Sequence, residues 1–355
     1  MPPWFADPRI GHFANDRSLS EAEVETLVHW VDGGAPEGDP GTKPAPIPWD
    51  DGWNIKPDVV YEMPQPFVIP KQGILQYVYI LLPMKFAEDT WVLDGELRPG
   101  NRSVIHHASV IVRPPGSNWM RAAKPGVPYF AGIEEQPTPA NPSSFLLGYA
   151  PGFSPHQDFL PGQDAGRLIP AGSDLLLEIH YTPNGTETTD QTKFGFVLAK
   201  KRPAKQLLNL VIDGRGFAIP PYATNHEGSA GVILNEPMTV VFAQPHLHLR
   251  GIDMKIDIFY PDGRSETLLS VPRYTFMWQL SYVLAKPLQL PKGTRVMVTA
   301  HWDNSANNKL NPDPSKTVRW GQQSTDEMLV ALLGGVVDTT TDRYRTLTKP
   351  AFKGN

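Results

Sequence analysis

The chain has 355 residues, long enough for two domains, and it contains 38 Pro and 30 Gly. Its 32 basic and 37 acidic side chains give a net charge of -5, so it lacks the basic excess of nucleic-acid-binding proteins. There is no cysteine, which excludes disulfides and thiolate metal sites. Proline, at about twice its usual share of about 5%, interrupts helices and central strands. Frequent turns, with short β-branched runs between them, favour an all-β protein.

One helix is predicted near the start of the chain. Ser20 is a suitable N-cap, and Glu23 three residues later completes a capping box. Apolar residues then follow at the spacing of one helix face: Val24, Leu27, Val28 and Val31. Gly33 and Gly34 end the helix, and residues 35–50 form a linker rich in Pro, Gly and Asp.

From residue 55 onward, short apolar runs alternate with Pro and Gly turns, a pattern typical of a sandwich or barrel. The first series comprises residues 77–82, 104–112, 175–181 and 194–198. A basic segment at residues 200–203 marks a boundary. The second series comprises residues 207–212, 238–242, 254–259, 296–301 and a run from 328 onward. The sequence therefore predicts an all-β chain with two β domains, 55–203 and 204–350, after an N-terminal segment of residues 1–50.

Two adjacent histidines lie inside one of the apolar runs. A regular strand sends neighbouring side chains to opposite faces, so His106 and His107 do not share a face there. One metal ion can take both rings only if the strand is distorted or if the rings use different nitrogens. The alternative is one buried and one exposed histidine.

Three further histidines stand in settings that suit a metal ligand. His180 ends a strand-like run, and Glu178 on the same face is either a partner that orients the ring or a solvated strand position. His246 and His248 have the spacing i, i+2, which places both rings on one face of a strand. The other five histidines have no comparable setting and are assigned no ligand role: His12, His29, His156, His226 and His301.

These histidines, with the segment Ser-Thr-Asp-Glu-Met at residues 324–328, resemble the copper type II, ascorbate-dependent monooxygenases. That family includes peptidylglycine α-hydroxylating monooxygenase and dopamine β-monooxygenase. The resemblance covers residues 55–345 and implies two jelly-roll β-sandwiches with two copper ions per chain. It implies a three-histidine set, formed by His106, His107 and His180. It also implies a methionine set, formed by His246, His248 and Met328.

The resemblance also implies a reaction. Copper at the methionine set activates O₂ and takes a hydrogen atom from an sp³ C–H of a small organic substrate, which becomes hydroxylated. Copper at the three-histidine set stores and delivers the second electron. The soft thioether of Met328 favours Cu(I), while imidazole suits either oxidation state. The expected partners are therefore the substrate, O₂ and an electron donor, either ascorbate-like or a cytochrome.

The chain departs from the animal enzymes of this family in two respects. Those enzymes are rich in disulfides, whereas this chain must hold its fold by core packing alone. Gln244 stands two residues before His246, where peptide-hydroxylating members use an Arg to grip the substrate carboxylate. An amide cannot supply that charge, so a peptide ending in glycine is not the expected substrate.

The first forty residues resemble a different family. Met1, the two prolines and Trp4, followed by the predicted helix, are similar to the last part of a class I cytochrome c, in which such a Met binds haem. The haem-attachment motif Cys-x-x-Cys-His is missing, so no bound haem is expected. The segment is either the end of a haem domain that begins upstream, which we favour, or a degenerate remnant that packs as a plain helix.

The sequence carries no export or membrane signal that we recognise. The N-terminus lacks the basic start and apolar core of a signal peptide. The longest apolar stretch late in the chain, residues 329–337, is far shorter than the roughly 20 residues of a membrane helix. The family resemblance nevertheless implies a periplasmic or secreted protein, with no membrane span and no nucleic-acid partner.

Two other functions stay open from the sequence. One is a copper-binding or carrier protein on the same scaffold without productive O₂ chemistry, which oxygen uptake with a reductant and a candidate substrate distinguishes. The other is a β-sandwich binding module, for example for carbohydrate, whose histidines are incidental. That module predicts no stoichiometric copper.

Overall fold

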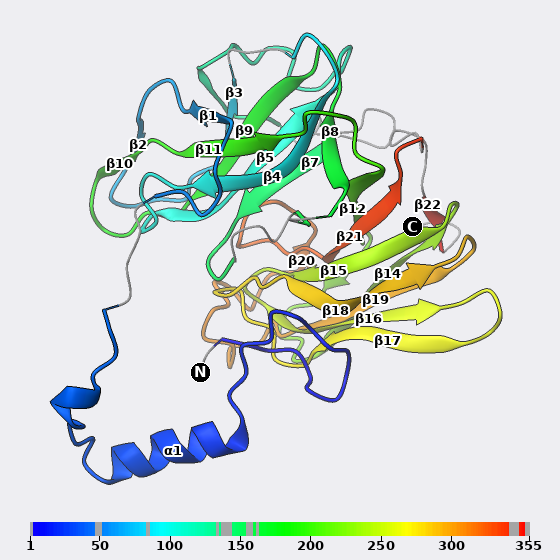
Figure 1. Ribbon diagram of the computed structural model, residues 1–355. Helices are drawn as coiled ribbons and strands as arrows, with labels where there is room; N and C mark the ends of the chain where they lie inside the picture. Colours follow the sequence, from blue (N-terminus) through cyan, green and yellow to red (C-terminus); the bar gives the residue numbers. More distant parts are fainter. Residues whose placement is uncertain are drawn as a thin grey trace.

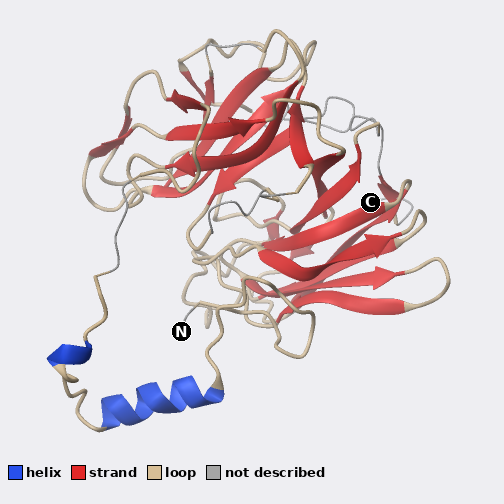
Figure 2. Ribbon diagram, viewed as in Figure 1, coloured by secondary structure: helices blue, strands red, loops and turns tan. Residues whose placement is uncertain are grey.

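The computed structural model describes residues 3–46, 52–82, 86–132, 135, 144–153, 159–160, 163–340 and 348–351. Strands make up 43% of the described residues and helices 5%. The strands form several sheets with sandwich-like packing, and a single α-helix is found among the described residues, near the N-terminus (Figures 1 and 2). The predicted all-β fold of β-sandwiches after a short helical segment is therefore confirmed.

The helix α1 (Glu21–Asp32) begins at the predicted cap. The backbone N–H of Glu23 donates to the Ser20 hydroxyl at 3.3 Å, and that of Ser20 donates to the Glu23 carboxylate at 2.8 Å, which completes the capping box. Its apolar stripe is exposed: Val24, Leu27, Val28 and Val31. The helix and the short 3-10 helix η1 (Pro40–Thr42) stand away from both sandwiches (Figure 1). Helical spacing thus predicted the helix, but no described element covers its apolar face.

The first sandwich packs two sheets against each other. One half of a larger sheet has the order β1 (Val59–Glu62), β11 (Lys193–Leu198), β4 (Thr90–Arg98) and β8 (Ala165–Ile169). The facing sheet has the order β6 (Pro128–Tyr129), β3 (Val78–Leu81), β9 (Asp174–Tyr181), β5 (Ile105–Arg113) and β7 (Ser144–Tyr149). A separate pair joins β2 (Phe67–Ile69) and β10 (Thr188–Asp190). The core between the sheets includes Val110, Leu177 and Phe196, all fully buried.

The second sandwich repeats this plan. The other half of the larger sheet has the order β12 (Lys205–Asp213), β21 (Val330–Asp338), β15 (Met238–His246) and β18 (Tyr282–Leu290). The facing sheet has the order β17 (Ser265–Val271), β16 (Gly251–Phe259), β19 (Arg295–Trp302), β14 (His226–Leu234) and β22 (Thr348–Pro350). A short pair joins β13 (Ala218–Ile219) and β20 (Val318–Arg319). In β19 every second residue from Val296 to Trp302 is buried, the period of two that a half-buried strand requires.

One continuous sheet of eight strands joins the two sandwiches. Strands β8 and β12 run parallel, with Lys205 opposite Ala165 and Gln206 opposite Gly166. The buried guanidinium of Arg167 on β8 also donates a hydrogen bond to the side-chain oxygen of Asn209 on β12. The two largest hydrophobic cores draw on residues 63–196 and on residues 208–337 with Ala6. The described part of the molecule therefore has two main cores but one shared sheet.

Residues 3–16 pack against the second sandwich, although the sequence grouped them with the N-terminal segment of residues 1–50. The backbone N–H of Ala14 donates to the Val283 carbonyl at 2.8 Å. The rings of Trp4 and Phe13 meet Tyr282 edge-on, with centroids 4.8 and 5.5 Å away. Residues 3–16 therefore belong to the second sandwich rather than to a separate N-terminal unit.

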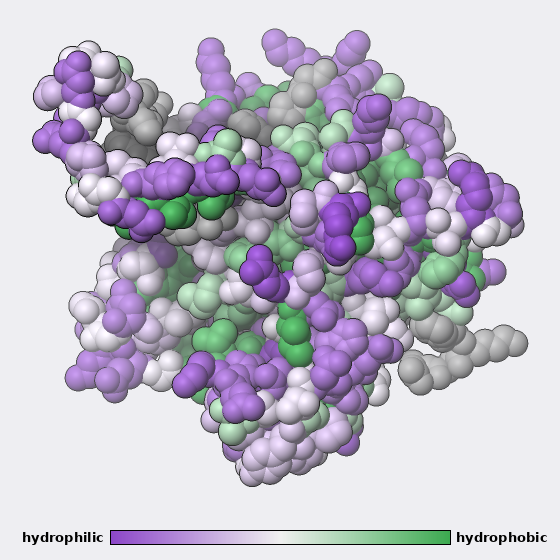
Figure 3. Space-filling view, turned by 90° about the horizontal axis from the view of Figure 1, so that it is seen from below, coloured by the Kyte–Doolittle hydropathy of each residue, from purple (hydrophilic) through white to green (hydrophobic). Residues whose placement is uncertain are grey.

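Hydrophilic side chains cover much of the surface seen from below, with smaller hydrophobic patches between them (Figure 3). Two of the exposed apolar side chains, Met277 and Trp278, lie in the loop between β17 and β18. Within the described residues, no helix has the length and apolar character needed to cross a membrane.

Gly334 on β21 lies opposite Phe242 of β15, and a Cβ atom at Gly334 would collide with that buried ring. We predict that Gly334→Ala displaces the ring and lowers the free energy of unfolding by about 1–3 kcal/mol. Urea denaturation measures the change. The control is Gly38→Ala, whose Cβ would meet nothing within 4 Å. Equal midpoints for the two variants would contradict the close packing of residue 334.

Candidate metal centre

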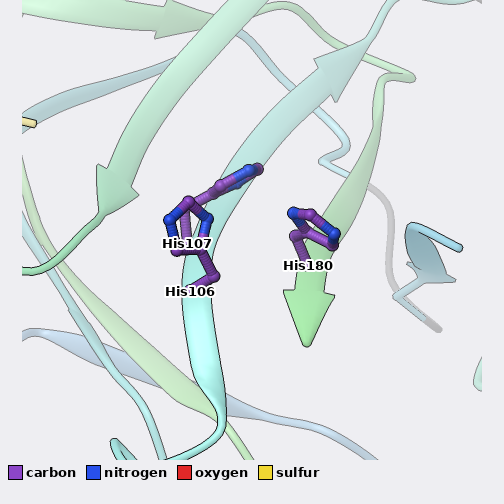
Figure 4. A group of neighbouring side chains, drawn as sticks. All are labelled: His106, His107 and His180. Carbon is purple, nitrogen blue, oxygen red and sulfur yellow. The ribbon is translucent and has the colours of Figure 1, made fainter. Parts of the chain in front are cut away.

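The three-histidine set meets at the ends of two neighbouring strands of the first sandwich. His106 and His107 lie at the start of β5, and His180 lies near the end of β9, which pairs with β5. One nitrogen from each ring can be chosen so that all three lie within 4.8 Å of one another. Figure 4 shows the three rings gathered in a small group. Among the described residues, this is the one group of three or more His, Cys, Asp or Glu side chains with such spacing.

A break in the strand pairing explains how two adjacent histidines reach one place. Ile105 pairs with Tyr181 and His107 pairs with His180, so His106 is an extra residue with no partner on β9. A bulge of this kind interrupts the strict alternation of side chains. The distortion that a shared site requires is therefore present at His106.

His106 is half-buried, but both of its ring nitrogens are buried, and neither makes a hydrogen bond of ordinary geometry with the described residues. Its ring stacks on Phe276 of the second sandwich, with centroids 4.3 Å and planes 21° apart. Burial, and then the neighbouring rings of His180 and His246, lower the pKa of His106 to about 3, against a smaller opposing effect of the Phe276 backbone. A neutral imidazole has one N–H and one lone pair, so this ring has a lone pair to offer a cation. Buried polar groups nearly always have a partner, which makes the unpaired nitrogens unusual.

Tyr77 on the neighbouring chain segment contacts the other two rings of the set. Its hydroxyl lies 3.0 Å from Nε2 of His107, and its ring stacks on His180 with centroids 4.6 Å and planes 12° apart. Burial lowers the pKa of His107 well below its usual value and that of His180 to about 4. Both rings are therefore neutral at pH 7. When Nε2–H of His107 donates to Tyr77, the lone pair of Nδ1 is free.

His246 and His248 form a second group at the end of β15, with ring centroids 5.2 Å apart. Nδ1–H of His246 donates to Oε1 of Gln279 at 2.7 Å, and Nδ1–H of His248 donates to the Asp326 carbonyl at 3.3 Å. These oxygens only accept, so each ring keeps its lone pair on Nε2. Metal-bound histidines are typically oriented by such a bond from the other nitrogen. Burial lowers the pKa of both rings.

Glu327 is a fully buried carboxylate that ties the loop after β15 to the chain before β21. It accepts from the backbone N–H of His248 at 2.9 Å, from that of Arg250 at 2.7 Å and from the Trp302 indole at 3.0 Å. Burial raises its pKa to about 7, although these hydrogen bonds oppose the shift. The carboxylate thus fixes where the His246–His248 segment lies.

Met328 is half-buried and directly follows Glu327. Strand β21 begins two residues later, with Val330 opposite His246 on β15. The Asp326 carbonyl two residues before Met328 contacts His248. The backbone at residue 328 therefore runs beside the His246–His248 pair.

Phe276 contacts one ring of each histidine group. Its ring stacks on His106 at 4.3 Å and meets His248 edge-on at 6.0 Å, with planes at 82°. The ring centres of His106 and His248 are therefore no farther apart than the sum of these two distances. One aromatic side chain therefore touches a histidine from each sandwich.

The remaining histidines have other surroundings. His301 on β19 lies between carboxylates of the two neighbouring strands, with Nδ1 2.8 Å from Asp253 and Nε2 3.4 Å from Glu227. His12 and His29 are exposed, and His226 is half-buried near Trp302. His156 lies outside the described residues.

Glu178 differs from both of its sequence interpretations. Its carboxylate is hydrogen-bonded with Tyr79, not with the ring of His180, and burial raises its pKa to about 7. It is half-buried rather than solvated. It therefore belongs to the surroundings of the Tyr77–Tyr79 stack.

Three contacts of the site were missed by sequence reasoning. Tyr77 is 30 residues from His107 and Gln279 is 33 residues from His246, and Phe276 reaches His106 from the other sandwich. No short motif links partners at such separations. Glu327 could have been found from the sequence, because it lies within the Asp-Glu-Met segment that the resemblance singles out.

The fold and the site together define an all-β protein of two sandwiches, with a histidine group from each at their junction. No protein-family model matches the chain, and no curated protein sequence matches it. Two crystal forms of PNGF-II resemble it with TM-scores of 0.28, identities of 10% and 9%, and coverage of 76% and 79% of this chain. The chain spans 62% and 65% of those PNGF-II chains. Infectious bursal disease virus Gx strain gives a TM-score of 0.21 at 9% identity, over 87% of this chain and 79% of that one. Similarities this low carry no argument about function.

The low pKa values of His106 and His180 predict how the metal-free protein responds to acid. The unfolded chain regains a histidine pKa of about 6.5, so it binds protons that the folded chain does not. The associated stability is fully present above about pH 6.5 and is lost as the pH falls towards the folded values of about 3 and about 4.

We therefore expect the stability of His106→Gln to fall less steeply than that of the wild type between about pH 6.5 and about pH 3. The reason is that the variant lacks one of the two histidines whose pKa is lowered by folding. Urea denaturation of the metal-free proteins at a series of pH values measures the two slopes. Parallel slopes would show that His106 titrates normally in the folded chain.

Proposed function

We propose that this chain binds two copper ions and uses them, with O₂ and an external reductant, to hydroxylate an sp³ carbon of a small organic substrate. The three-histidine set holds one ion and the methionine set holds the other. The observation that carries the proposal is the meeting of two histidine groups from separate sandwiches, in the order and with the residue types of the copper monooxygenase family.

The donor atoms support copper over zinc. Imidazole suits copper in either oxidation state, and the thioether of Met328 is a soft donor that favours Cu(I). Zinc sites use Cys, His and carboxylates, and the chain has no Cys. Two imidazoles with a thioether therefore suit copper, and the unequal donor sets suit two ions with different roles.

The surroundings of the rings fit a bound cation. His106 has two buried nitrogens that make no hydrogen bond of ordinary geometry with the described part of the chain. His246 and His248 each use Nδ1 in a hydrogen bond and leave the Nε2 lone pair free. A cation at these lone pairs would supply the partners that burial in a protein normally demands.

Bound copper supplies electron transfer and the activation of O₂, and the protein supplies geometry and the exclusion of water. Gln279 and the Asp326 carbonyl fix the orientation of the His246 and His248 rings. Glu327 holds the loop that carries them. Phe276 packs an apolar ring against His106 of one group and His248 of the other.

Residue 244 bears on the substrate. Gln244 is buried on β15, two residues before His246, and its amide offers no positive charge to a carboxylate. The proposed substrate is therefore a small organic molecule other than a peptide ending in glycine. An ascorbate-like molecule or a cytochrome as the electron donor, and a periplasmic or secreted location, belong to the same proposal. A copper carrier on this scaffold would differ in consuming no O₂ with reductant and candidate substrates.

Copper stoichiometry tests the two sites separately. After loading and desalting, we expect two ions per wild-type chain and one in either His107→Ala or His246→Ala, because each variant loses a ligand of a different set. Elemental mass spectrometry measures the ratio. His226→Ala, a half-buried histidine outside both groups, should keep both ions. A wild-type chain that retains no copper would refute the proposed function.

Met328→Ile removes the thioether while keeping an apolar side chain of similar size. We expect weaker Cu(I) binding at one site, loss of a sulfur scatterer from the X-ray absorption spectrum of the reduced protein, and loss of hydroxylation. Met297→Ile, at a half-buried position on β19, is the matched control. An identical sulfur signal in Met328→Ile and the control would remove Met328 from the ligand set.

A further inference from the structure

The loop between β17 and β18, residues 272–281, carries two side chains that contact the histidine groups. Phe276 stacks on His106, and Oε1 of Gln279 accepts a hydrogen bond from Nδ1–H of His246. Gln279 is buried, and its Nε2 makes no hydrogen bond with the described residues. One hydrogen bond therefore holds its side-chain amide, so the position of the loop backbone decides how that amide meets His246.

The start of this loop is held by the second sandwich itself. The backbone N–H of Tyr274 donates to the Ile252 carbonyl at 2.7 Å, and its buried hydroxyl donates to the Leu247 carbonyl at 2.7 Å. Gln279 lies beyond these bonds, nearer the end of the loop. Its position therefore depends on what holds the chain at Ser281.

The end of the loop is held by the N-terminal segment, at Asn15. Nδ2 of Asn15 donates to the Ser281 carbonyl at 2.8 Å, and its Oδ1 accepts from the backbone N–H of Val283 at 2.9 Å. The backbone N–H of Ala14 donates to the Val283 carbonyl beside it at 2.8 Å. Because β18 is the edge strand of its sheet, the Asn15 side chain bonds to the start of this strand as a neighbouring strand would.

The same segment reaches the first sandwich two residues later. Nη1 of Arg17 donates to the Gly152 carbonyl at 3.2 Å. Gly152 packs closely on the loop, because a Cβ atom there would lie 2.7 Å from the Trp278 ring and 2.8 Å from the Leu280 side chain. The N-terminal segment therefore bonds both to the end of the loop and to the turn of the first sandwich that packs on it.

We propose that Asn15 is a positioning residue for the methionine set, and that the N-terminal segment holds Gln279 in place for His246. The proposal rests on the proposed copper function, in which His246 is a ligand. An amide with one hydrogen bond keeps its orientation only while its backbone stays in place. The two hydrogen bonds of Asn15 fix that backbone, and without them the end of the loop opens locally more often while both sandwiches stay folded.

Hydrogen exchange in the metal-free chain tests this positioning without copper. The probe is the Nδ1 proton of His246, assigned by nitrogen-15 NMR as the imidazole signal that His246→Ala loses. We expect this proton to exchange with solvent about tenfold faster in Asn15→Ala, because local opening then breaks two hydrogen bonds fewer. The control is Asn54→Ala, which loses a side-chain hydrogen bond to Glu96 in the first sandwich and should exchange as the wild type does.

Equal exchange in Asn15→Ala and Asn54→Ala overturns the proposal. So does a wild type without a protected Nδ1 proton on His246, since Gln279 then does not hold that ring. Asn15→Asp keeps the acceptor for the Val283 N–H but loses the donor to the Ser281 carbonyl, and it should also exchange faster than the wild type. If Asn15→Ala does not fold, Asn15→Asp carries the test, and exchange at the wild-type rate contradicts the role of Asn15.

Copper loading separates a failure of this proposal from a failure of the proposed function. In a His107→Ala background the remaining Cu(II) belongs to the methionine set, and its electron paramagnetic resonance spectrum reports that set. Adding Asn15→Ala should broaden the spectrum, because Gln279 no longer holds one orientation of His246, whereas adding Asn54→Ala should leave it unchanged. If no copper binds while exchange responds to Asn15→Ala, the copper function fails and the positioning stands. If copper binds and neither measurement responds, the positioning fails alone.

Discussion

The shared eight-stranded sheet is the constraint on which the arrangement of both histidine groups depends. Strands β8 and β12 pair in parallel where the two sandwiches meet. The hydrogen bonds of this sheet therefore set the relative position of the two sandwiches. Domains joined only by a linker are expected to move against each other. Here the pairing keeps His106 and His248 in contact with the same ring, that of Phe276.

The cost of burial explains why the histidine groups point to a ligand. A buried polar group without a partner costs about 1–3 kcal/mol, and His106 has two such nitrogens. Desolvation removes the option of protonation, which is why its pKa falls to about 3. A cation at the lone pairs would offset this cost, so metal binding and folding stability would be coupled. Without a cation, the unpaired buried nitrogens of His106 lower the stability of the folded chain.

The two groups differ in what surrounds them. The three-histidine set is packed by aromatic rings, with Tyr77 stacked on His180 and Phe276 stacked on His106. The other pair is held by oriented hydrogen-bond acceptors, and Glu327 fixes its loop.

The sequence by itself determined the local features, because they depend on neighbours along the chain: the capping box of Ser20 and Glu23, the alternation of buried residues in β19, and the candidate histidines. Tertiary structure alone decided the rest. The bulge at His106 arises from pairing with β9, and strand alternation without it would separate the two adjacent rings. The contacts of Phe276 and Gln279, and the exposure of the α1 stripe, depend on packing between segments distant in sequence, which no local pattern encodes.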